Sequence, residues 1–536
     1  MSPVAVALAA WAVALAIGSP LRAQDAGAAP APSAPTAPPA PSAPEDDEPR
    51  GLRLREPGAF EGWTLFGPLN SRKVHLVDLD GELVHTWETT HRPGGQLMML
   101  ENGHLLRGAH KEGVPRFEGG GIGGLIQELG WDGEVLWQYE LSNDQRVLHH
   151  DFKRLPNGNL LLIAWEAHEP AEAYALGRDA GSVPETGLWP DVLYEVQPTR
   201  PQGGEIVWTW RVWDHLVQDR DPAKPNHGTL REQPGRLDIN AGRKERPETE
   251  EERRQREALE EEMRALGYVG GGEADEPDTP AGTAGDGAAG ASPTATAGAT
   301  QPGGPGPRDG DWLHSNSVDY LPAQDLIVMS TPRLSELWVI DHGTTTAEAA
   351  TSRGGRRGHG GDLLWRWGNP AVWGQGGEAD QRLFAQHDAR WLPAPRVGEL
   401  RLLVFNNGLK RPGGEEYSTV EELVLPFDEE RGFLREEGQP FGPSGPAWSY
   451  ADKGRFYSAF ISGAQRLPNG NTLICEGAKG RILEVTADGR IVWDFWNPHG
   501  GEAPPSPQGG NAPPKALFRA TRIAADHPGV RAKLQP

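Results

Sequence analysis

Short hairpins built around an Asn-Gly turn recur along this chain of 536 residues. Asn-Gly favours a type I′ turn, because both central residues of such a turn need positive φ. Each copy therefore predicts two antiparallel strands rather than a helix. Three clear copies occupy residues 97–108, 152–166 and 464–477, and two degenerate copies occupy 318–330 and 389–405.

A second kind of hairpin, which ends at a Trp, alternates with the first. Two hairpins give four strands per repeat, which is the content of one β-propeller blade. Six copies of the second kind therefore predict an all-β fold, a six-bladed β-propeller with four-stranded antiparallel blades. The first blade needs inner strands from 62–68 or from 516–523, and the latter would close the ring. The copies occupy 75–87, 126–139, 193–210, 337–367 and 482–495, and 420–434 takes the same place without its Trp.

The Trp residues that end these hairpins recur at one position of the repeat. Large aromatic side chains dominate core burial. We therefore expect them to pack between neighbouring blades rather than to form an aromatic ligand site. They are Trp87, Trp137, Trp208, Trp365 and Trp493.

Composition divides the chain around these repeats. An apolar run followed by small residues predicts a signal peptide over 1–23, with an uncleaved anchor as the alternative. An Ala/Pro-rich linker follows over 24–50. Residues 215–311 are first charged and then rich in Gly, Ala, Thr and Pro, which predicts a partly helical, otherwise disordered insertion outside the core. The propeller is expected over 51–214 and 312–525, with a tail over 526–536.

Charge and cysteine content exclude several classes of function. Lys and Arg number 52 against 75 Asp and Glu, and the resulting net charge of −23 argues against a nucleic-acid partner. The single Cys475 excludes an intramolecular disulfide framework and a Cys-rich zinc site. Beyond the N-terminal signal or anchor, no segment approaches the run of about 20 apolar residues that spans a bilayer.

Three histidines fall at related positions ahead of the first-type hairpins. His150 and His387 each lie five residues before the Leu of their turn, and His314 lies seven before its own. Side chains alternate along a strand, so an offset of two residues keeps the same direction. If these histidines open the innermost strands, their imidazoles converge at one mouth of the central channel. The loop that carries Arg333 returns to the same mouth.

Two carboxylates, Asp151 and Asp388, directly follow two of these histidines. Strand alternation points them away from the neighbouring imidazole, so we expect them to be structural. A catalytic role would need a local break in the strand register.

The histidines and Arg333 could bind a metal, stabilise an anion or carry covalent chemistry. Arg333 disfavours a three-His zinc site, because a permanent cation repels a divalent metal unless an anionic substrate lies between them. Two alternatives to an anion-transferring enzyme stay open. One is a non-catalytic exported binding scaffold, and the other is a metal-dependent hydrolase or lyase that uses the same histidines.

The motifs around these residues resemble a known family. They are HHDFKRLPNGNLL from His149, WLHSNSVDYL from Trp312, STPRLSELWVID from Ser330, FAQHDARWLP from Phe384 with the following FNNG, and the hairpins from Gly463. In order and spacing, over about 60–210 and 312–525, they resemble the bacterial arylsulfate sulfotransferases, which are six-bladed propellers. The pair Thr331-Pro332 stands where that family more often has Ser-Arg directly.

The resemblance implies transfer of a sulfuryl group from an aryl sulfate ester to a phenolic acceptor, through a sulfohistidine and without a cofactor or metal. His387 matches the nucleophile, and His150, His314 and Arg333 match the residues around the sulfuryl group. It also implies an exported protein, periplasmic or extracellular, that binds small molecules. A homo-oligomer is compatible with the resemblance. The substrate-binding residues implied are Asn316, His149 and Asn407.

Overall fold

The computed structural model describes residues 49–113, 116–242, 249–266, 268, 310–393, 396–501 and 515–534. The described residues belong to one compact unit that begins at Asp46. The predicted signal peptide, almost all of the predicted linker and most of the low-complexity half of the insertion lie outside them. Within the described residues, no helix is both long enough and apolar enough to cross a membrane.

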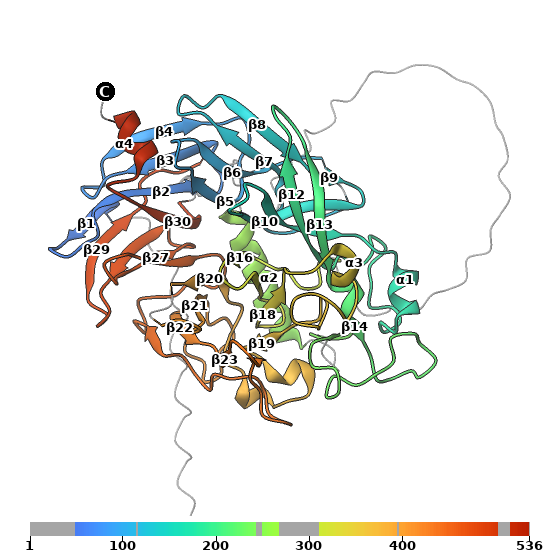
Figure 1. Cartoon of the computed structure of the whole chain (residues 1–536). Helices are drawn as coiled ribbons and strands as arrows, with labels where there is room; N and C mark the ends of the chain where they lie inside the picture. The colour runs from blue at the N-terminus through green and yellow to red at the C-terminus, as the bar shows by residue number, and fades with distance from the viewer. Residues whose placement is uncertain are drawn as a thin grey trace, which may run out of the picture. The chain divides into compact units, whose positions relative to one another are not determined.

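Six antiparallel sheets form a ring, which confirms the predicted six-bladed β-propeller (Figure 1). From the channel outward, blade 1 consists of β30 (Leu517–Ala524), β2 (Gly62–Pro68), β3 (Lys73–Val77) and β4 (Leu83–Glu88). Blade 2 consists of β5 (Pro93–Met99), β6 (Leu105–His110), β7 (Gly124–Leu129) and β8 (Val135–Glu140). Blade 3 consists of β10 (Arg146–Arg154), β11 (Leu160–Glu166), β12 (Asp191–Pro198) and β13 (Gly204–Arg211), with the short β9 (Ser142–Asn143) paired to β10.

The second half of the chain builds the other three blades. Blade 4 consists of β16 (Ser317–Leu321), β17 (Leu326–Thr331), β18 (Glu336–Asp341) and β19 (Trp365–Trp367). Blade 5 consists of β20 (His387–Leu392), β21 (Arg401–Asn406), β22 (Thr419–Val424) and β25 (Trp448–Tyr450). Blade 6 consists of β26 (Gly463–Arg466), β27 (Thr472–Glu476), β28 (Arg481–Val485), β29 (Ile491–Trp496) and the added β1 (Gly51–Arg55).

The shorter elements lie in the loops between these strands. The loop strands are β14 (Leu216–Val217), β15 (Leu237–Asp238), β23 (Phe427–Asp428) and β24 (Gly432–Phe433). The helices are α1 (Pro170–Ala175), α2 (Glu250–Ala265), α3 (Thr346–Ala349) and α4 (Pro528–Leu534). In Figure 1, α2 lies across the middle of the ring.

The two ends of the described chain close the ring. β30, from the C-terminal end, is the innermost strand of blade 1 and pairs antiparallel with β2 from the N-terminal end. The innermost strands then contact one another in the order β30, β5, β10, β16, β20, β26 and back to β30. At the outer edge, β1 pairs with β29, so blade 6 also contains strands from both ends. Pairing between distant parts of the chain leaves no open gap in the ring.

The repeated Trp side chains pack between blades, as predicted. All five are at least nine-tenths buried, and each indole N–H donates a hydrogen bond to a group on the next blade. Trp87 bonds the Gly130 carbonyl at 3.1 Å, and Trp493 bonds the Leu79 carbonyl at 2.9 Å. The Trp493 contact joins blade 6 to blade 1. These indoles therefore fix how neighbouring blades sit against each other.

We expect Trp493→Phe to lower the free energy of unfolding by about 2 kcal/mol, because it leaves the buried Leu79 carbonyl without its donor and shrinks the side chain. Urea unfolding followed by tryptophan fluorescence measures the change. Trp391→Phe is the matched control, because the indole N–H of Trp391 is buried without a hydrogen-bond partner among the described residues. An equal loss in both variants would contradict a role for the interblade hydrogen bond.

The expectation that residues 215–311 lie outside the core is wrong for part of that segment. Leu216, Leu237 and Ile239 are buried in the same hydrophobic cluster as Trp210 and Leu313. The physical reason is local: a few apolar side chains within a charged stretch suffice to cover the joint between blades 3 and 4. The average composition of the stretch conceals them. Tyr268, discussed below, is likewise buried.

Candidate functional site

The predicted histidines meet at one mouth of the channel. His150 lies within β10, His387 opens β20, and His314 lies three residues before β16. The rings of His150 and His314 are 4.5 Å apart between centroids and pack edge to face. The backbone φ is 56° at His150 and 58° at His314. The pairing register of β10 with β11 shifts between Leu148 and Phe152. The strand therefore bends locally where the imidazole enters the channel.

On one side, His150 is held by a second histidine. His149 Nδ1 lies 2.8 Å from His150 Nδ1, and His149 Nε2 lies 3.1 Å from a carboxylate oxygen of Asp191. The other oxygen of Asp191 accepts a hydrogen bond from the backbone N–H of Ser315 at 3.1 Å. The His149 ring stacks on Trp165, with 4.3 Å between centroids. His149 thus links a buried carboxylate to His150 and orients its ring.

On the other side, a tyrosine bridges the two channel histidines. The Tyr268 hydroxyl lies 2.7 Å from His150 Nε2 and 3.2 Å from His314 Nε2. His314 Nδ1 in turn contacts the buried carboxylate of Asp311. A continuous chain of polar contacts therefore crosses the mouth, from Asp191 through these side chains to Asp311.

Donor and acceptor requirements limit where the hydrogens along this chain can lie. The facing Nδ1 atoms of His149 and His150 share one hydrogen, so one ring donates and the other accepts. The Tyr268 hydroxyl can donate to His150 Nε2 or accept from it. The tyrosine oxygen can accept from His314, whose other nitrogen faces Asp311. His150 Nε2 and His314 Nε2 thus stand on either side of one phenolic oxygen.

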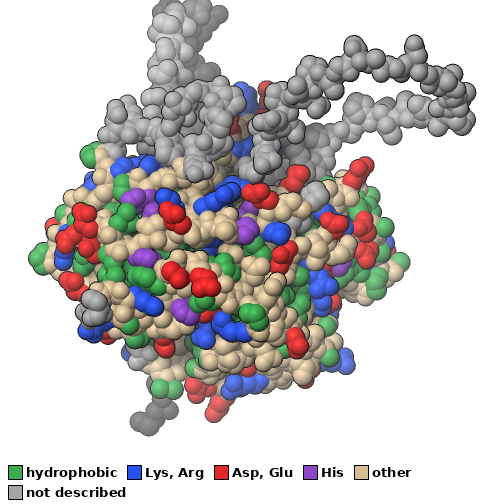
Figure 2. All heavy atoms as spheres, turned by 90° about the horizontal axis from the view of Figure 1, so that it is seen from above, with side chains coloured by type: hydrophobic (Ala, Val, Ile, Leu, Met, Phe, Trp, Pro, Cys, Tyr) green, Lys and Arg blue, Asp and Glu red, His purple; other side chains and the backbone are tan. Residues whose placement is uncertain are grey.

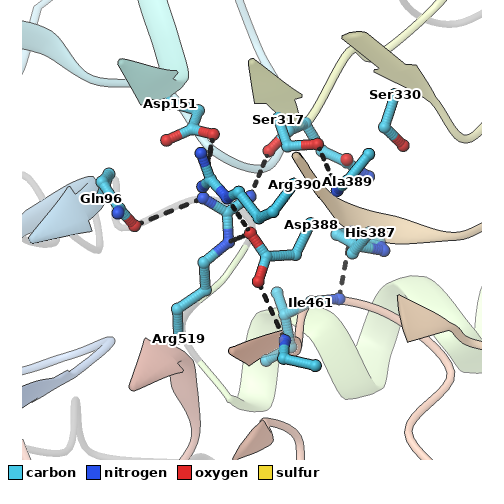
Figure 3. Close-up of polar contacts among 12 residues, drawn as sticks. Gln96, Asp151, Ser317, Ser330, His387, Asp388, Ala389, Arg390, Ile461 and Arg519 are labelled. Carbon is cyan, nitrogen blue, oxygen red and sulfur yellow. Dashed lines mark hydrogen bonds and ion pairs between the residues drawn. The ribbon is translucent and has the colours of Figure 1, made fainter. Parts of the chain in front are cut away.

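His387 has partners of its own. Its Nδ1 lies 2.8 Å from the amide oxygen of Asn407 and 3.1 Å from the Ala385 carbonyl. The Asn407 amide nitrogen donates to two backbone carbonyls, which fixes the amide with its oxygen toward the ring. Nδ1 therefore carries the hydrogen, and Nε2 keeps its lone pair. The backbone N–H of Ile461 donates to that Nε2 at 3.2 Å (Figure 3).

Burial keeps the two inner imidazoles neutral. It lowers the pKa of His387 to about 3, and positive charge at His314 and Arg519 acts in the same direction against the hydrogen bond to Asn407. Burial also lowers the pKa of His150 well below its ordinary value, and the other channel histidines add to the effect. Both rings are therefore unprotonated at neutral pH.

Arg333 acts through Asp311. Its guanidinium donates to the Asp311 backbone carbonyl and lies 3.3 Å from the Asp311 carboxylate. Burial disfavours the charge on that carboxylate, but Arg333 and His314 together hold its pKa below the ordinary value. The Arg333 side chain is 39% exposed, so it lies at the rim of the mouth. The Asp311 carboxylate therefore links Arg333 to His314, as the predicted convergence requires.

The three residues that the family resemblance implies for substrate binding are spread along the wall of the site. His149 and Asn407 each contact a channel histidine, as described above. Asn316 donates its amide hydrogen to the Gln386 carbonyl at 2.8 Å, and its amide oxygen is buried without a hydrogen-bond partner among the described residues. His149 contacts the His150 imidazole and Asn407 contacts the His387 imidazole, so both position channel histidines. Asn316 instead offers its buried amide oxygen as an acceptor.

Sequence reasoning missed Tyr268 and Arg519. Tyr268 lies in the segment that we expected to be outside the core. Arg519 lies on β30, where alternation along the predicted closing strand could have pointed it toward the channel. Its guanidinium lies 3.0 Å from both Asp151 and Asp388 (Figure 3). It adds a buried cation beside the histidines.

Other features of the described structure lie outside this site. On the face drawn in Figure 2, acidic and basic side chains are interspersed. In the part of the chain that the structure describes, no group of three or more His, Cys, Asp or Glu side chains is arranged to hold a metal ion. A cavity of about 650 Å³ lies between blades 4 and 5, lined by Trp373, Arg435 and Phe441 among others, and away from the histidines.

Comparison with known proteins points to one family. The family model for arylsulfotransferase (ASST) matches residues 69–423. No curated protein matches the chain. Solved structures that it resembles include a protein of unknown function from Bacteroides caccae, at 10% identity and TM-score 0.37 over 86% of this chain and 98% of that one. Another is a periplasmic gluconolactonase from Pseudomonas aeruginosa, at 10% identity and TM-score 0.35 over 81% and 96%.

Proposed function

We propose, from the premise that this chain belongs to the arylsulfotransferase family, that it transfers a sulfuryl group from an aryl sulfate ester to a phenol through a sulfohistidine at His387. The observation that carries the proposal is the state of the His387 ring. Asn407 fixes the hydrogen on Nδ1, and burial keeps Nε2 unprotonated, so a neutral nucleophile is ready at neutral pH.

The histidines around the mouth divide the acid and base roles. As His387 Nε2 bonds to sulfur, the sulfur–oxygen bond of the donor breaks and the departing phenolate takes a proton from His314. In the second half, the acceptor phenol gives its proton to His150 while its oxygen bonds to sulfur and the nitrogen–sulfur bond breaks. Arg333 and Arg519 supply fixed positive charge near the developing anion.

The proposal includes export of the protein, which rests on the apolar run of residues 4–18. Fractionation of expressing cells tests it, and a product confined to the cytosol would contradict it.

Purified protein mixed with 4-nitrophenyl sulfate tests the activity. We expect released nitrophenol to increase when a second phenol is added, with ping-pong kinetics, because the donor phenol leaves before the acceptor binds. In samples quenched early after mixing with donor alone, intact-mass and peptide analysis should find a sulfuryl group on His387, before its transfer to an acceptor. Absence of nitrophenol release would favour a binding scaffold, and release that a chelator abolishes would favour a metal-dependent hydrolase.

The pH profile gives a further prediction. A histidine with its ordinary pKa of about 6.5 would lose about 30-fold of its neutral form by about pH 5. Because burial lowers the pKa of His387 to about 3, its neutral form persists as the pH falls. We expect kcat/KM for the aryl sulfate to stay within about twofold from pH 7 to pH 5. An acid limb with an apparent pKa near 6.5 would contradict the buried, neutral nucleophile.

A further inference from the structure

Tyr268 is itself a phenol, and it occupies the position that the proposed function gives to a substrate. Its side chain is buried, and its hydroxyl contacts both His150 and His314, the residues assigned as base and acid. Burial raises the pKa of this hydroxyl above its ordinary value, and Asp311 adds to the effect, so the group is a neutral phenol with a hydrogen to donate. No other described tyrosine contacts these histidines.

The wall around Tyr268 has the shape of a seat for an aromatic ring. A Cβ on Gly120 would fall 2.3 Å from Tyr268 Cε1, so only glycine leaves room for the ring there. A Cβ on Gly121, whose φ is +76°, would fall 2.2 Å from the His150 ring. Phe460 covers the tyrosine ring from another side, with 5.6 Å between centroids. The Gly-rich loop thus leaves space for both a phenol and its base.

Helix α2 delivers Tyr268 to this seat. A capping box of Thr249 and Glu252 starts the helix. Leu259 and Met263 pack against the cluster that contains Phe460 and Tyr268. No residue of α2 is fully buried, and the apolar contact of Leu259, Met263 and Leu266 together with the tyrosine helps to hold the helix to the mouth. Such a contact can open without unfolding the propeller.

We propose that Tyr268 is an acceptor in cis, so that the protein sulfates its own tyrosine. This inference rests on the proposed function. After α2 moves away, an aryl sulfate reacts with His387 and its phenol leaves with a proton from His314. When Tyr268 returns, its oxygen bonds to sulfur, the bond from sulfur to His387 Nε2 breaks, and the hydroxyl proton goes to His150. The balance is one aryl sulfate consumed, one phenol released and one tyrosine sulfate ester formed.

The experiment uses the full-length protein with 4-nitrophenyl sulfate and no added acceptor. Peptide mass spectrometry should find one sulfuryl group on Tyr268 of the wild type. Tyr268→Phe keeps the ring but lacks the acceptor oxygen, so it should release nitrophenol and retain the group on His387. Tyr417→Phe, which changes a tyrosine stacked on Arg411, is the control and should leave Tyr268 sulfation unchanged.

A mixture of two variants separates reaction in cis from reaction between molecules. Tyr268→Phe supplies the nucleophile, and His387→Ala supplies Tyr268. We expect no sulfated Tyr268 in the mixture, and its appearance at the wild-type rate would overturn the inference. Nitrophenol release by the wild type without sulfated Tyr268 would also overturn it while leaving the proposed function standing. No nitrophenol release by any variant would overturn both.

Discussion

His387→Ala should lower the rate of sulfuryl transfer by about 10⁴-fold or more. The variant lacks the channel imidazole whose Nδ1 hydrogen is fixed by a side-chain amide, which leaves its Nε2 as an acceptor. His150 is a poorer candidate, because its two nitrogens contact the side chains of His149 and Tyr268, whereas Nε2 of His387 contacts a backbone N–H. The initial rate of nitrophenol release from 4-nitrophenyl sulfate, with a saturating second phenol, measures the loss.

His227→Ala is the matched control, since this histidine is exposed on a loop outside the mouth and should keep the wild-type rate. Circular dichroism and the urea midpoint show whether His387→Ala still folds. A folded His387→Ala protein that turns over within tenfold of the wild type would exclude His387 as the nucleophile. A metal-bound water or another side chain would then have to attack sulfur.

Repeat register alone predicts much of the site. Equivalent positions in successive blades face the same channel, so counting back from each turn brings His150, His314 and His387 to one mouth. The structure has this arrangement, with His150 and His314 in edge-to-face contact. The count succeeds because the propeller repeats one hairpin geometry around its axis, and the position of a residue within the hairpin therefore fixes its height in the channel.

Register fails where the backbone leaves regular strand geometry. Asp388 points away from the His387 ring, as expected, but not because the strand alternates. Its φ is 58°, and the pairing of β20 with β21 shifts between His387 and Arg390. Asp adopts left-handed φ more often than most residues, but the residue type alone does not say which Asp does so, and strand alternation could not predict it.

Composition fails for a related reason. The segment that carries Tyr268 and Leu237 is charged and poor in apolar residues on average, and averages predict disorder. Burial depends on individual side chains, however, and one ring in a glycine-lined seat is enough to place a segment. The signal that could have identified Tyr268 is its isolation, as a lone aromatic residue after an amphipathic helical stretch.

At the centre of the ring, two arginines and two aspartates bind the innermost strands together. Arg390 donates to Asp388 at 2.7 Å and to Asp151 at 2.9 Å, and Arg519 lies 3.0 Å from each carboxylate (Figure 3). The free oxygen of Asp388 accepts from the backbone N–H of Ala464 at 2.9 Å. These residues come from blades 1, 3, 5 and 6, so the network takes the place of an apolar core where six strands converge.

Asp388→Asn should lower the free energy of unfolding by about 3–5 kcal/mol, because it removes the carboxylate that Arg390 and Arg519 share and leaves Asp151 and Asp319 to balance these two buried cations. Urea unfolding near pH 7 measures the loss. In the wild type, burial opposes the charge of Asp388, but Arg519 and Arg390 lower its pKa, so its contribution is present above the ordinary carboxyl pKa and is lost as the pH falls below it. Exposed Asp526→Asn is the control and should change stability by less than about 0.5 kcal/mol. An Asp388→Asn protein as stable as the wild type but slow in turnover would assign this carboxylate to the chemistry, because a structural carboxylate between two buried arginines cannot be neutralised without destabilising the fold.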